Sequence, residues 1–403
     1  MLVYLAPCGI GLGHISRCTV IARELKKLGY DVLFSTYGDA INYAKTHGFP
    51  VVTVPDIRMV ERPDGTVDMK RTAVRMFQGL WTFFKQLRLE IKYLGSFKPK
   101  IILSDTRLST VLASFILREK PCYLLTNQLR LYIPHIKKLT KWRKRLKKMG
   151  EIIMLHVLML FWNRSTKILA VDFPPELTIS HATLDLPKTL SKKVHFIGPI
   201  ITPPVFLSDS EKQKIRRKYG ANSKNSYLIY AGISGTRHEV NFLIDNILLP
   251  LFKQFPKNYV FVISKGNIAK KDVFIHEDNV WVYEWIDDRI GIMNACDVFI
   301  GRPGQLSVAE TFYLGKPAIW IPSPAHTEQI ANAYSSRKIG VGVLLYQPSL
   351  TYTKLRKAID HLIFSKDVKN ALEYVKQEAS KYNAAKTIVE MIKQHTTSEL
   401  AYS

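Results

Sequence analysis

The chain has 403 residues, of which 47% are hydrophobic and 23% charged, a composition typical of globular proteins. This length exceeds the usual size of one hydrophobic core, so we expect two domains of roughly 200 residues each. The net charge of +25 favours an anionic partner, which can be a phosphorylated substrate, an anionic membrane surface or nucleic acid.

Cysteine usage and hydropathy argue against several classes of protein. The four cysteines have no C-x-x-C or metal-ligand spacing, so we expect a reducing compartment and neither zinc nor haem. The first residues read as a strand and a loop, without the basic region and cleavage site of a signal peptide. The longest apolar run, Ile152 to Trp162, has 11 residues, short of the roughly 20 that cross a bilayer, so we expect no transmembrane helix.

The N-terminal half alternates short apolar strands with helices. The predicted strands are Leu2–Ala6, Asp31–Ser35, Val51–Val54 and Ile101–Ser104, and the predicted helices are His14–Leu28, Ala40–Thr46, an amphipathic Arg71–Leu94 and Ser109–Glu119. Strands that alternate with helices predict a parallel, doubly wound sheet.

A glycine-rich loop joins the first strand to the first helix. It contains Gly9, Gly11 and Gly13, and glycines there can bring backbone N–H groups close to a phosphate or an acceptor. A dinucleotide cofactor is not expected, because the second strand does not end in the acidic residue that binds a ribose. We predict no cofactor.

The segment from Arg130 to Lys148 carries nine basic residues and no acid, and runs directly into the apolar EIIMLHVLMLFWNR. Basic residues beside an apolar and aromatic patch predict contact with an anionic membrane surface, although a solvated face is the alternative. The predicted membrane-associating residues are Lys141, Arg143, Lys144, Arg145, Lys147, Lys148 and Trp162. The helix Arg71–Leu94 fits either this surface or core packing.

A proline-rich stretch, Ile200 to Pro204, reads as an interdomain linker. A second alternating set follows it, with strands at Tyr227–Tyr230, Tyr259–Ser264, Val280–Tyr283, Val298–Ile300 and Ala318–Ile321, a helix after Glu239 and a final helix at about Asn383–Gln394. We therefore expect a domain over 1–200, a second over 201–382, and a C-terminal helix over 383–403.

Two loops of the second half can bind a nucleotide diphosphate. Ser234, Gly235 and Thr236 follow a strand and offer N–H and hydroxyl groups, although a plain strand-to-helix turn is the alternative. Asp287 and Asp288 fit helix capping better than metal binding.

The segment Asp297 to Gly342 combines a strand, a glycine turn, a helix and a second strand. The helix, predicted over Ser307–Leu314, ends at Gly315. The N–H groups of Gln305, Leu306 and Ser307 at its start suit a diphosphate, because a helix N-terminus offers unpaired donors and a positive dipole end. Glu310 can accept ribose hydroxyls. Glu328, Gln329 and Asn332 offer carboxylate and amide groups that can bind the hydroxyls of a hexose.

These residues resemble the MurG-like branch of the GT-B glycosyltransferases. The family pattern is S/G-R-x-G-x-L-T/S-x-x-E, then G-x-P, then Q-x-x-N-A. The chain matches it at Gly301, Arg302, Gly304, Leu306, Ser307, Glu310, Gly315, Pro317, Gln329, Asn332 and Ala333. Glu328 replaces the first amide of the family's Gln-Gln pair, a departure that concerns the identity of the donor hexose.

The resemblance implies two Rossmann-like doubly wound domains facing a cleft, an α/β architecture. It implies an inverting reaction that needs no metal, and it matches Ile286 to an isoleucine whose backbone reads uracil. His14 matches a histidine of the family, and its place at a helix start disfavours imidazolium, so we predict a general base. Asp105 lies where relatives carry an acid that orients this histidine, although capping of the next helix is the alternative.

We therefore expect an enzyme that moves a sugar, with N-acetylglucosamine the leading candidate, from a UDP-sugar donor onto a lipid-linked sugar acceptor. The polyprenyl phosphate or diphosphate acceptor and an anionic membrane are the expected partners, at the cytoplasmic face of the cell membrane, as in N-glycan or cell-envelope assembly. A sugar-nucleotide 2-epimerase and a transferase with another lipid or small-molecule acceptor are the alternatives. Nucleic acid is not an expected partner, since no nucleic-acid-binding motif accompanies the basic charge.

Overall fold

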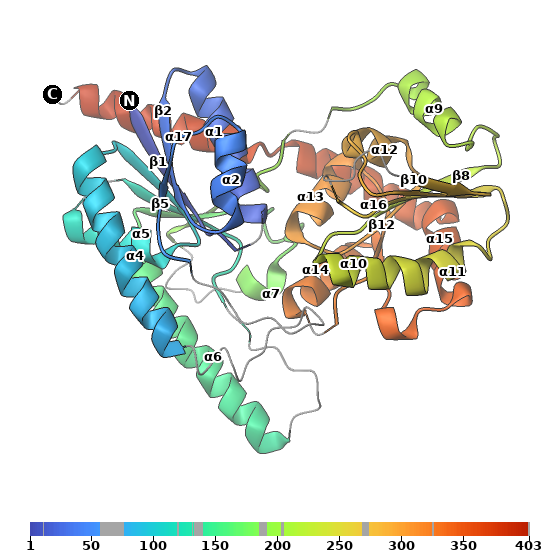
Figure 1. Ribbon diagram of the computed structural model, residues 1–403, viewed down its shortest axis with the longest axis horizontal. Coiled ribbons are helices and arrows are strands. Elements are labelled where there is room, and N and C mark those ends of the chain that lie inside the picture. Colours follow the sequence, from blue (N-terminus) through green and yellow to red (C-terminus); the bar gives the residue numbers. More distant parts are fainter. Residues whose placement is uncertain are drawn as a thin grey trace. The chain divides into compact units, whose positions relative to one another are not determined.

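The computed structural model describes residues 1–403 except 11, 57–75, 119–120, 131, 133–139, 185–191, 203–204, 268–273, 325 and 402–403, and it describes 76–78 and 396–401 without their side chains. The chain forms two compact units. Unit 1 holds the described residues up to Thr202 together with those from Tyr382 onward, and unit 2 holds those between Pro203 and Lys381 (Figure 1).

Unit 1 is built on a seven-stranded sheet in the order β3-β2-β1-β4-β5-β6-β7, in which every pairing is parallel. The strands are β1 Leu2–Pro7, β2 Asp31–Thr36, β3 Val51–Thr53, β4 Ile101–Asp105, β5 Cys122–Thr126, β6 Lys167–Ala170 and β7 Val194–Phe196. Because helices cover both faces of a parallel sheet, its central strands are buried and mostly apolar, with polar residues at the carboxyl ends of β4 and β5.

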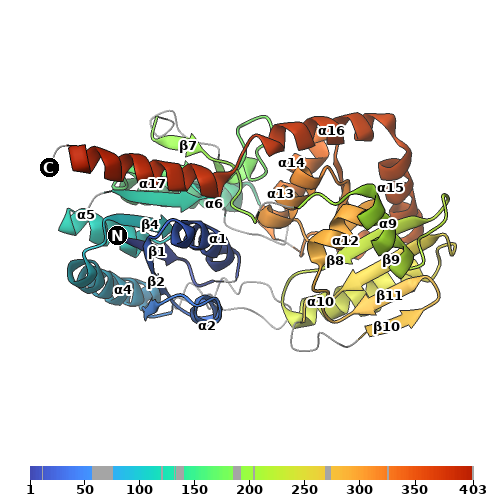
Figure 2. The ribbon, with the colours of Figure 1, turned by 90° about the horizontal axis from the view of Figure 1, so that it is seen from above.

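The helices of unit 1 are α1 Gly13–Lys27, α2 Asp39–Thr46, α4 Met76–Phe97, α5 Leu108–Leu117, α6 Lys141–Trp162, α7 His181–Leu184 and α17 Ala384–Ala401. Successive side chains of β1 point to opposite faces of the sheet. Val3 and Leu5 pack with α1, α2 and α17, whereas Tyr4 and Ala6 pack with α4, α5 and α6. The C-terminal helix α17 therefore belongs to the core of unit 1, along which Figure 2 shows it in red.

Unit 2 repeats this plan with a second seven-stranded sheet, in the order β10-β11-β9-β8-β12-β13-β14. Only the pairing of β10 with β11 is antiparallel among the described strands. The strands are β8 Tyr227–Gly232, β9 Tyr259–Ser264, β10 Phe274–Glu277, β11 Val280–Tyr283, β12 Val298–Gly301, β13 Ala318–Trp320 and β14 Gly342–Leu344.

The helices of unit 2 are α9 Asp209–Lys218, α10 Arg237–Leu243, α11 Leu249–Phe252, α12 Arg289–Ala295, α13 Gln305–Leu314, α14 Thr327–Ile339, α15 Tyr352–Phe364 and α16 Lys366–Ser380, with a π-helix at Ile244–Leu248 and a 3-10 helix at Gln347–Ser349. Gly315 ends α13 in the left-handed conformation, at φ 61°, as predicted from its sequence.

The sheet order of each unit creates a switch point, where neighbouring strands connect in opposite directions. In unit 1 it lies between β1 and β4, and in unit 2 between β8 and β12. Ligands of open α/β sheets bind outside the carboxyl ends of the strands at such points. The two α/β sheets confirm the predicted fold class, and both glycine loops, Asp105 and the start of α13 follow strands at these two places.

Candidate active site

The switch point of unit 1 brings together the predicted base and its predicted partner. Asp105 ends β4 and is completely buried, while His14 lies in the first turn of α1 with its side chain 25% exposed. His14 Nδ1 lies 2.9 Å from Asp105 Oδ1. The structure therefore supplies the geometry in which an acid orients a histidine ring. Because Asp105 lies before α5 and bonds to α1, it is not the cap of the following helix.

Arg17 joins this pair and was not predicted. It lies one turn after His14 on α1, so both side chains share one face of the helix. Its Nε donates to Asp105 Oδ2 at 2.6 Å, its Nη2 pairs with Asp105 Oδ1, and the same Nη2 lies 2.9 Å from His14 Nδ1. Nη1 donates to Oδ1 of Asn127 at 3.3 Å, at the end of β5. His14, Asp105 and Arg17 form what we call the His14 cluster.

The charge of Asp105 is fixed by this cluster. Burial alone would raise the pKa of its carboxyl, but Arg17 and then His14, through charge and hydrogen bonds, hold that pKa well below its usual range. The carboxylate is therefore ionised at neutral pH and accepts hydrogen bonds from Arg17, while His14 Nδ1 lies within hydrogen-bond distance of it.

The glycine loop before α1 has two different environments. A side chain at Gly9 would overlap the backbone oxygen of Tyr37, so close packing requires glycine there. Gly13, in contrast, faces open space and is exposed. No side chain caps the start of α1. Gly11 lies outside the described residues. Binding of a phosphate or an acceptor by this loop stays a prediction.

The switch point of unit 2 presents the start of α13, which follows β12. The cap residue of α13 is Gly304, which offers no side-chain cap, and the helix begins at Gln305, two residues earlier than predicted. Gln305 is buried, and Leu306 and Ser307 are half-buried. Because Gly304 has no side chain to cap α13, the start of this helix suits the binding of an anion.

Glu310 on α13 is paired with an arginine that sequence reasoning missed. Arg289, the first residue of α12, places its Nη2 2.6 Å from Glu310 Oε2. Burial alone would lower the pKa of the Arg289 guanidinium, but the charge of Glu310 raises it above its usual range. The carboxylate of Glu310 is therefore held in one place by a cation.

Asn332 packs behind the turn that precedes α13, and its predicted contact with the hexose stays a prediction. It is completely buried, and its Nδ2 donates to the carbonyl of Pro303 at 3.1 Å. Asn332 therefore fixes the turn in front of α13 from behind. Gln329 has a comparable contact, because its Oε1 accepts from the backbone N–H of Ser323 at 2.8 Å. Glu328 is half-buried in the first turn of α14.

The second glycine loop, between β8 and α10, is exposed at Ser234, Gly235 and Thr236. Thr236 caps α10, because its hydroxyl accepts from the N–H of Glu239 at 3.4 Å and Glu239 Oε2 accepts from the N–H of Thr236 at 3.3 Å. This reciprocal capping box is sufficient to explain Thr236. Asp288 caps α12, as expected, through the N–H of Gly291. Ile286, just before it, is half-buried.

The basic segment forms α6, whose N-cap is Thr140. Trp162, predicted to contact a membrane, is only 2% exposed and packs in the core of unit 1, so that prediction was wrong. Lys144, Lys147 and Lys148 line a cavity on one face of the helix. Lys137 and Lys138, also in the basic segment, lie outside the described residues. In the described part of the chain, no helix is both long and apolar enough to cross a membrane.

Among the described residues, no group of three or more His, Cys, Asp and Glu side chains is arranged to hold a metal ion. Independence from metal stays a prediction.

Comparison with known proteins agrees with this architecture. The model of the glycosyltransferase family 28 C-terminal domain matches residues 235–392, which include the start of α13 and the Glu310 pair. The chain is 23% identical to an uncharacterized glycosyltransferase of Methanosarcina acetivorans, over 97% of this chain and 98% of that protein. The fold matches the crystal structure of Acinetobacter baumannii MurG with a TM-score of 0.61 at 16% identity, over 98% of this chain and 99% of the other.

A second relative in sequence carries a more specific name. The chain is 25% identical, over 42% of its length and 48% of the relative, to the "UDP-N-acetylglucosamine--N-acetylmuramyl-(pentapeptide) pyrophosphoryl-undecaprenol N-acetylglucosamine transferase" of Caldicellulosiruptor saccharolyticus. The chain resembles the MurG-like glycosyltransferases and shares their GT-B fold. It has the His14 cluster at one switch point and the start of α13 at the other.

Proposed function

We propose that the protein moves a sugar, with N-acetylglucosamine the leading candidate, from a UDP-sugar onto a lipid-linked sugar acceptor, with inversion at the anomeric carbon. The observation that carries this proposal is the hydrogen bond between His14 and the buried Asp105 at the switch point of unit 1. An oriented histidine beside a permanently ionised carboxylate is the arrangement of a general base. The names of the relatives support the classes of donor and acceptor.

We assign the proton of the neutral ring to His14 Nδ1, where it is donated to Asp105. Arg17 already directs its N–H groups at the same carboxylate, which keeps Asp105 charged and able to accept from the ring. Nε2 is then the nitrogen that takes the proton of the acceptor hydroxyl. As that oxygen bonds to the anomeric carbon of the donor, the bond from this carbon to the β-phosphate oxygen breaks and UDP leaves.

Unit 2 binds the donor in this proposal. The uncapped start of α13 and the exposed loop at Ser234 offer backbone N–H groups to the diphosphate, which stabilises the charge that develops on the leaving UDP without a metal ion. Glu310, fixed by Arg289, accepts the ribose hydroxyls. Ile286 contacts the uracil, while Glu328 and Gln329 contact the hexose.

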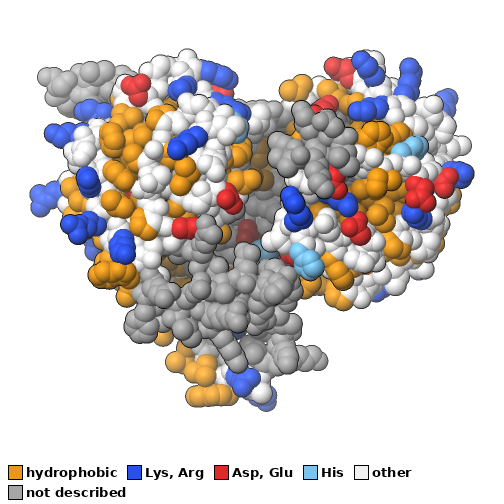
Figure 3. Space-filling model, in the orientation of Figure 1, with side chains coloured by type: hydrophobic (Ala, Val, Ile, Leu, Met, Phe, Trp, Pro, Cys, Tyr) orange, Lys and Arg blue, Asp and Glu red, His pale blue; other side chains and the backbone are white. Residues whose placement is uncertain are grey.

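The surface of α6 supports membrane association. Six apolar residues recur at spacings of three and four along this helix and are between 44% and 68% exposed, so they form one face, which we call the α6 stripe: Trp142, Leu146, Met149, Ile153, Val157 and Leu160. The opposite face carries the buried Leu155, Leu158 and Trp162. Figure 3 shows hydrophobic and basic side chains together at the lower end of the view.

The helix α4 extends this apolar surface. Its residues Leu80, Trp81 and Phe84 are exposed, while Leu87 and Leu94 pack in the core of unit 1, so core packing applies to one part of the helix and the other part is free to contact a membrane in this proposal. The rings of Phe83 and Phe161 meet edge to face at 6.1 Å and join α4 to α6. Exposed apolar residues with adjacent lysines and arginines suit an anionic bilayer surface, which we place at the cytoplasmic face of the membrane.

Membrane binding is tested by sedimentation with anionic vesicles. The double variant Ile153→Asp/Leu160→Asp adds charge to the α6 stripe and is expected to lose most of its vesicle binding. Met154→Asp is the control, because Met154 is exposed on the same helix outside the stripe. Equal binding by all three proteins would contradict the membrane assignment.

The enzymatic proposal is tested with labelled UDP-N-acetylglucosamine and synthetic polyprenyl-diphosphate-N-acetylglucosamine, by counting label that enters the organic phase. We expect transfer by the wild type and none by His14→Ala. Binding of the donor without transfer, together with formation of a 2-epimer of the sugar nucleotide, would replace the proposal with epimerase chemistry. Transfer to other acceptors alone would retain the enzyme class and change the acceptor.

A further inference from the structure

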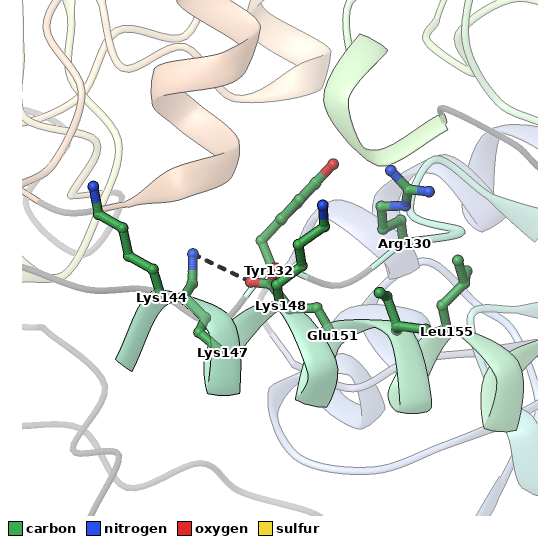
Figure 4. A pocket seen from close by; sticks show the side chains of 8 residues that line it. Arg130, Tyr132, Lys144, Lys147, Lys148, Glu151 and Leu155 are labelled. Carbon is green, nitrogen blue, oxygen red and sulfur yellow. Dashed lines mark ion pairs between the residues drawn. The ribbon is translucent and has the colours of Figure 1, made fainter. Parts of the chain in front are cut away.

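The inner face of α6 lines a basic cavity that no prediction included. The cavity has a volume of about 500 Å³ and is lined by Arg130, Tyr132, Lys144, Lys147, Lys148, Glu151, Ile152 and Leu155. All of these residues belong to unit 1. The three lysines come from two adjacent turns of α6, and Figure 4 shows them with Arg130 and Tyr132 around the cavity.

The charge of the cavity is strongly one-sided. Among the described lining residues, four cations face the single carboxylate of Glu151, which is paired with Lys147 Nζ at 3.2 Å. Cations that lie close together on one helix face repel one another, and a bound anion relieves this repulsion. Multiply charged phosphates are the anions that Arg and Lys clusters bind best.

The cavity is also amphiphilic. Ile152, Leu155 and the ring of Tyr132 form part of its wall, and the hydroxyl of Tyr132 donates to the carbonyl of Ala182 at 3.0 Å, so the ring is held in place. A free phosphate needs no apolar wall. A diphosphate attached to a hydrocarbon chain matches both kinds of lining residue, because its charged group meets the lysines and its first carbons meet the apolar side chains.

The cavity is connected to the His14 cluster through one short segment. Asn127, at the start of this segment, accepts a hydrogen bond from Arg17, and the backbone N–H groups of Leu129 and Arg130 donate to the carbonyl of Thr183. The segment is therefore anchored both at the cluster and beside α7. The same side of the sheet thus carries the base and, further along, the cations.

Resting on the proposed function, we propose that this cavity binds the diphosphate of the lipid-linked acceptor, with Arg130, Lys144, Lys147 and Lys148 as its ligands. The lipid chain continues along the apolar wall toward the membrane that the α6 stripe contacts. This assignment moves Lys144, Lys147 and Lys148 from general attraction to the membrane to recognition of the acceptor. Substrate binding in unit 1 then depends on this cavity and not only on the glycine loop.

Two soluble probes, farnesyl diphosphate and inorganic pyrophosphate, test the site by calorimetry on the full chain. Lys144→Gln/Lys148→Gln removes two cations from the cavity, and Arg88→Gln/Lys92→Gln removes two exposed cations from α4 as the matched control. We expect farnesyl diphosphate to bind the wild type and the control within about twofold of each other, and the cavity variant about tenfold or more weakly. Equal losses in both variants would overturn the site.

The two probes separate the sources of the anion. Tighter binding of farnesyl diphosphate than of pyrophosphate supports a lipid-carried diphosphate, whereas equal affinities would overturn that assignment in favour of a free phosphate. UDP affinity and thermal melting of each variant show whether the protein remains folded. An unfolded cavity variant would be replaced by Lys144→Arg/Lys148→Arg, which keeps the charge and is expected to retain binding.

Failure of this inference can be told from failure of the proposed function. If the wild type transfers sugar to the lipid acceptor but the acceptor KM is the same in the cavity variant and the control, the function stands and the cavity assignment is overturned. If the cavity variant alone loses farnesyl diphosphate binding and no protein transfers sugar, the site stands and the function is overturned.

Discussion

The two units place different kinds of group at the switch points of their sheets. Unit 1 buries charged side chains there, with Arg17 and Asp105 paired beside His14. Unit 2 presents the uncapped backbone of α13, and among the described residues its buried Arg302 donates to neutral oxygens, those of Ile321 and Gln347. Buried charge suits a proton acceptor that must keep one tautomer, whereas backbone dipoles suit a leaving diphosphate.

The largest effect is expected from breaking the charged cluster of unit 1. Arg17→Met leaves the buried Asp105 carboxylate without its cation, so we expect a loss of about 3–5 kcal/mol in the free energy of unfolding. The measurement is urea unfolding at pH 7 and at pH 5. The loss should shrink at the lower pH, because the stranded carboxyl takes up a proton. A pH-independent loss below about 1 kcal/mol would contradict the role given to this pair.

Asp172 is a second buried acid of unit 1 and differs from Asp105, because backbone N–H groups hold it in place of an arginine. It accepts from Phe173, Ile179 and Ser180, and burial, its largest influence, raises its pKa to about 6 despite those hydrogen bonds. The folded protein therefore keeps this proton between about pH 4 and 6, where the unfolded chain has lost it. Its contribution to stability is complete below about pH 4 and is lost as the pH rises to about 6.

The measurement for Asp172 is the unfolding free energy of wild type and Asp172→Asn between pH 4 and 7. We expect the wild type to lose up to about 3 kcal/mol more than the variant over this interval. The window is separate from that of Asp105, whose lowered pKa gives a contribution lost only as the pH falls below about 4. Parallel curves for the two proteins would contradict the assignment.

Arg302→Met is the counterpart in unit 2 of the Arg17 substitution. Both arginines are nearly completely buried, but the loss of Arg302 strands neutral oxygens and no charge. We expect a loss of about 1–3 kcal/mol, smaller than for Arg17→Met and independent of pH between 5 and 7. Urea unfolding of both variants under one set of conditions makes the comparison, and equal losses would contradict it.

The smallest effect is expected at the capping box of unit 2. Thr236→Ala removes the side-chain cap of α10 and should cost about 1 kcal/mol of stability. If capping is the whole task of this hydroxyl, UDP affinity stays unchanged. Thr236→Ser, which retains the cap, is the control. A loss of UDP binding in the alanine variant alone would assign the hydroxyl to the donor site.

Local sequence patterns were sufficient for the elements that position both switch points. The glycine loops, the strands before them and the end of α13 at Gly315 depend on short-range rules of turn and cap chemistry. Helix α6 was not predicted as one element, because it has an apolar face on each side and its charges interrupt a single period. The same two-sided pattern led Trp162 to be assigned to the membrane when it faces the core.

The pairing of side chains depends on contacts between segments that lie far apart in the chain. Local sequence patterns do not predict such contacts. Arg17 shares a helix face with His14, and this spacing could have predicted that the two side chains lie close together. Its partner Asp105 lies on a strand far along the chain, which no local pattern indicates. Arg289 meets Glu310 only because α12 and α13 pack together in the folded unit. Asn332 fits the motif in sequence, yet its helix turns it inward toward Pro303.

The measurement that tests the central claim most directly compares His14→Ala with Glu310→Ala in two assays, turnover at saturating donor and equilibrium binding of UDP. We expect His14→Ala to lose about 10²–10⁴-fold in turnover with UDP affinity unchanged, because the base acts in unit 1. Glu310→Ala should weaken UDP binding about tenfold, because the donor is held in unit 2. Near-normal turnover of His14→Ala, or the same pattern of losses in both variants, would contradict the division of roles between the two switch points.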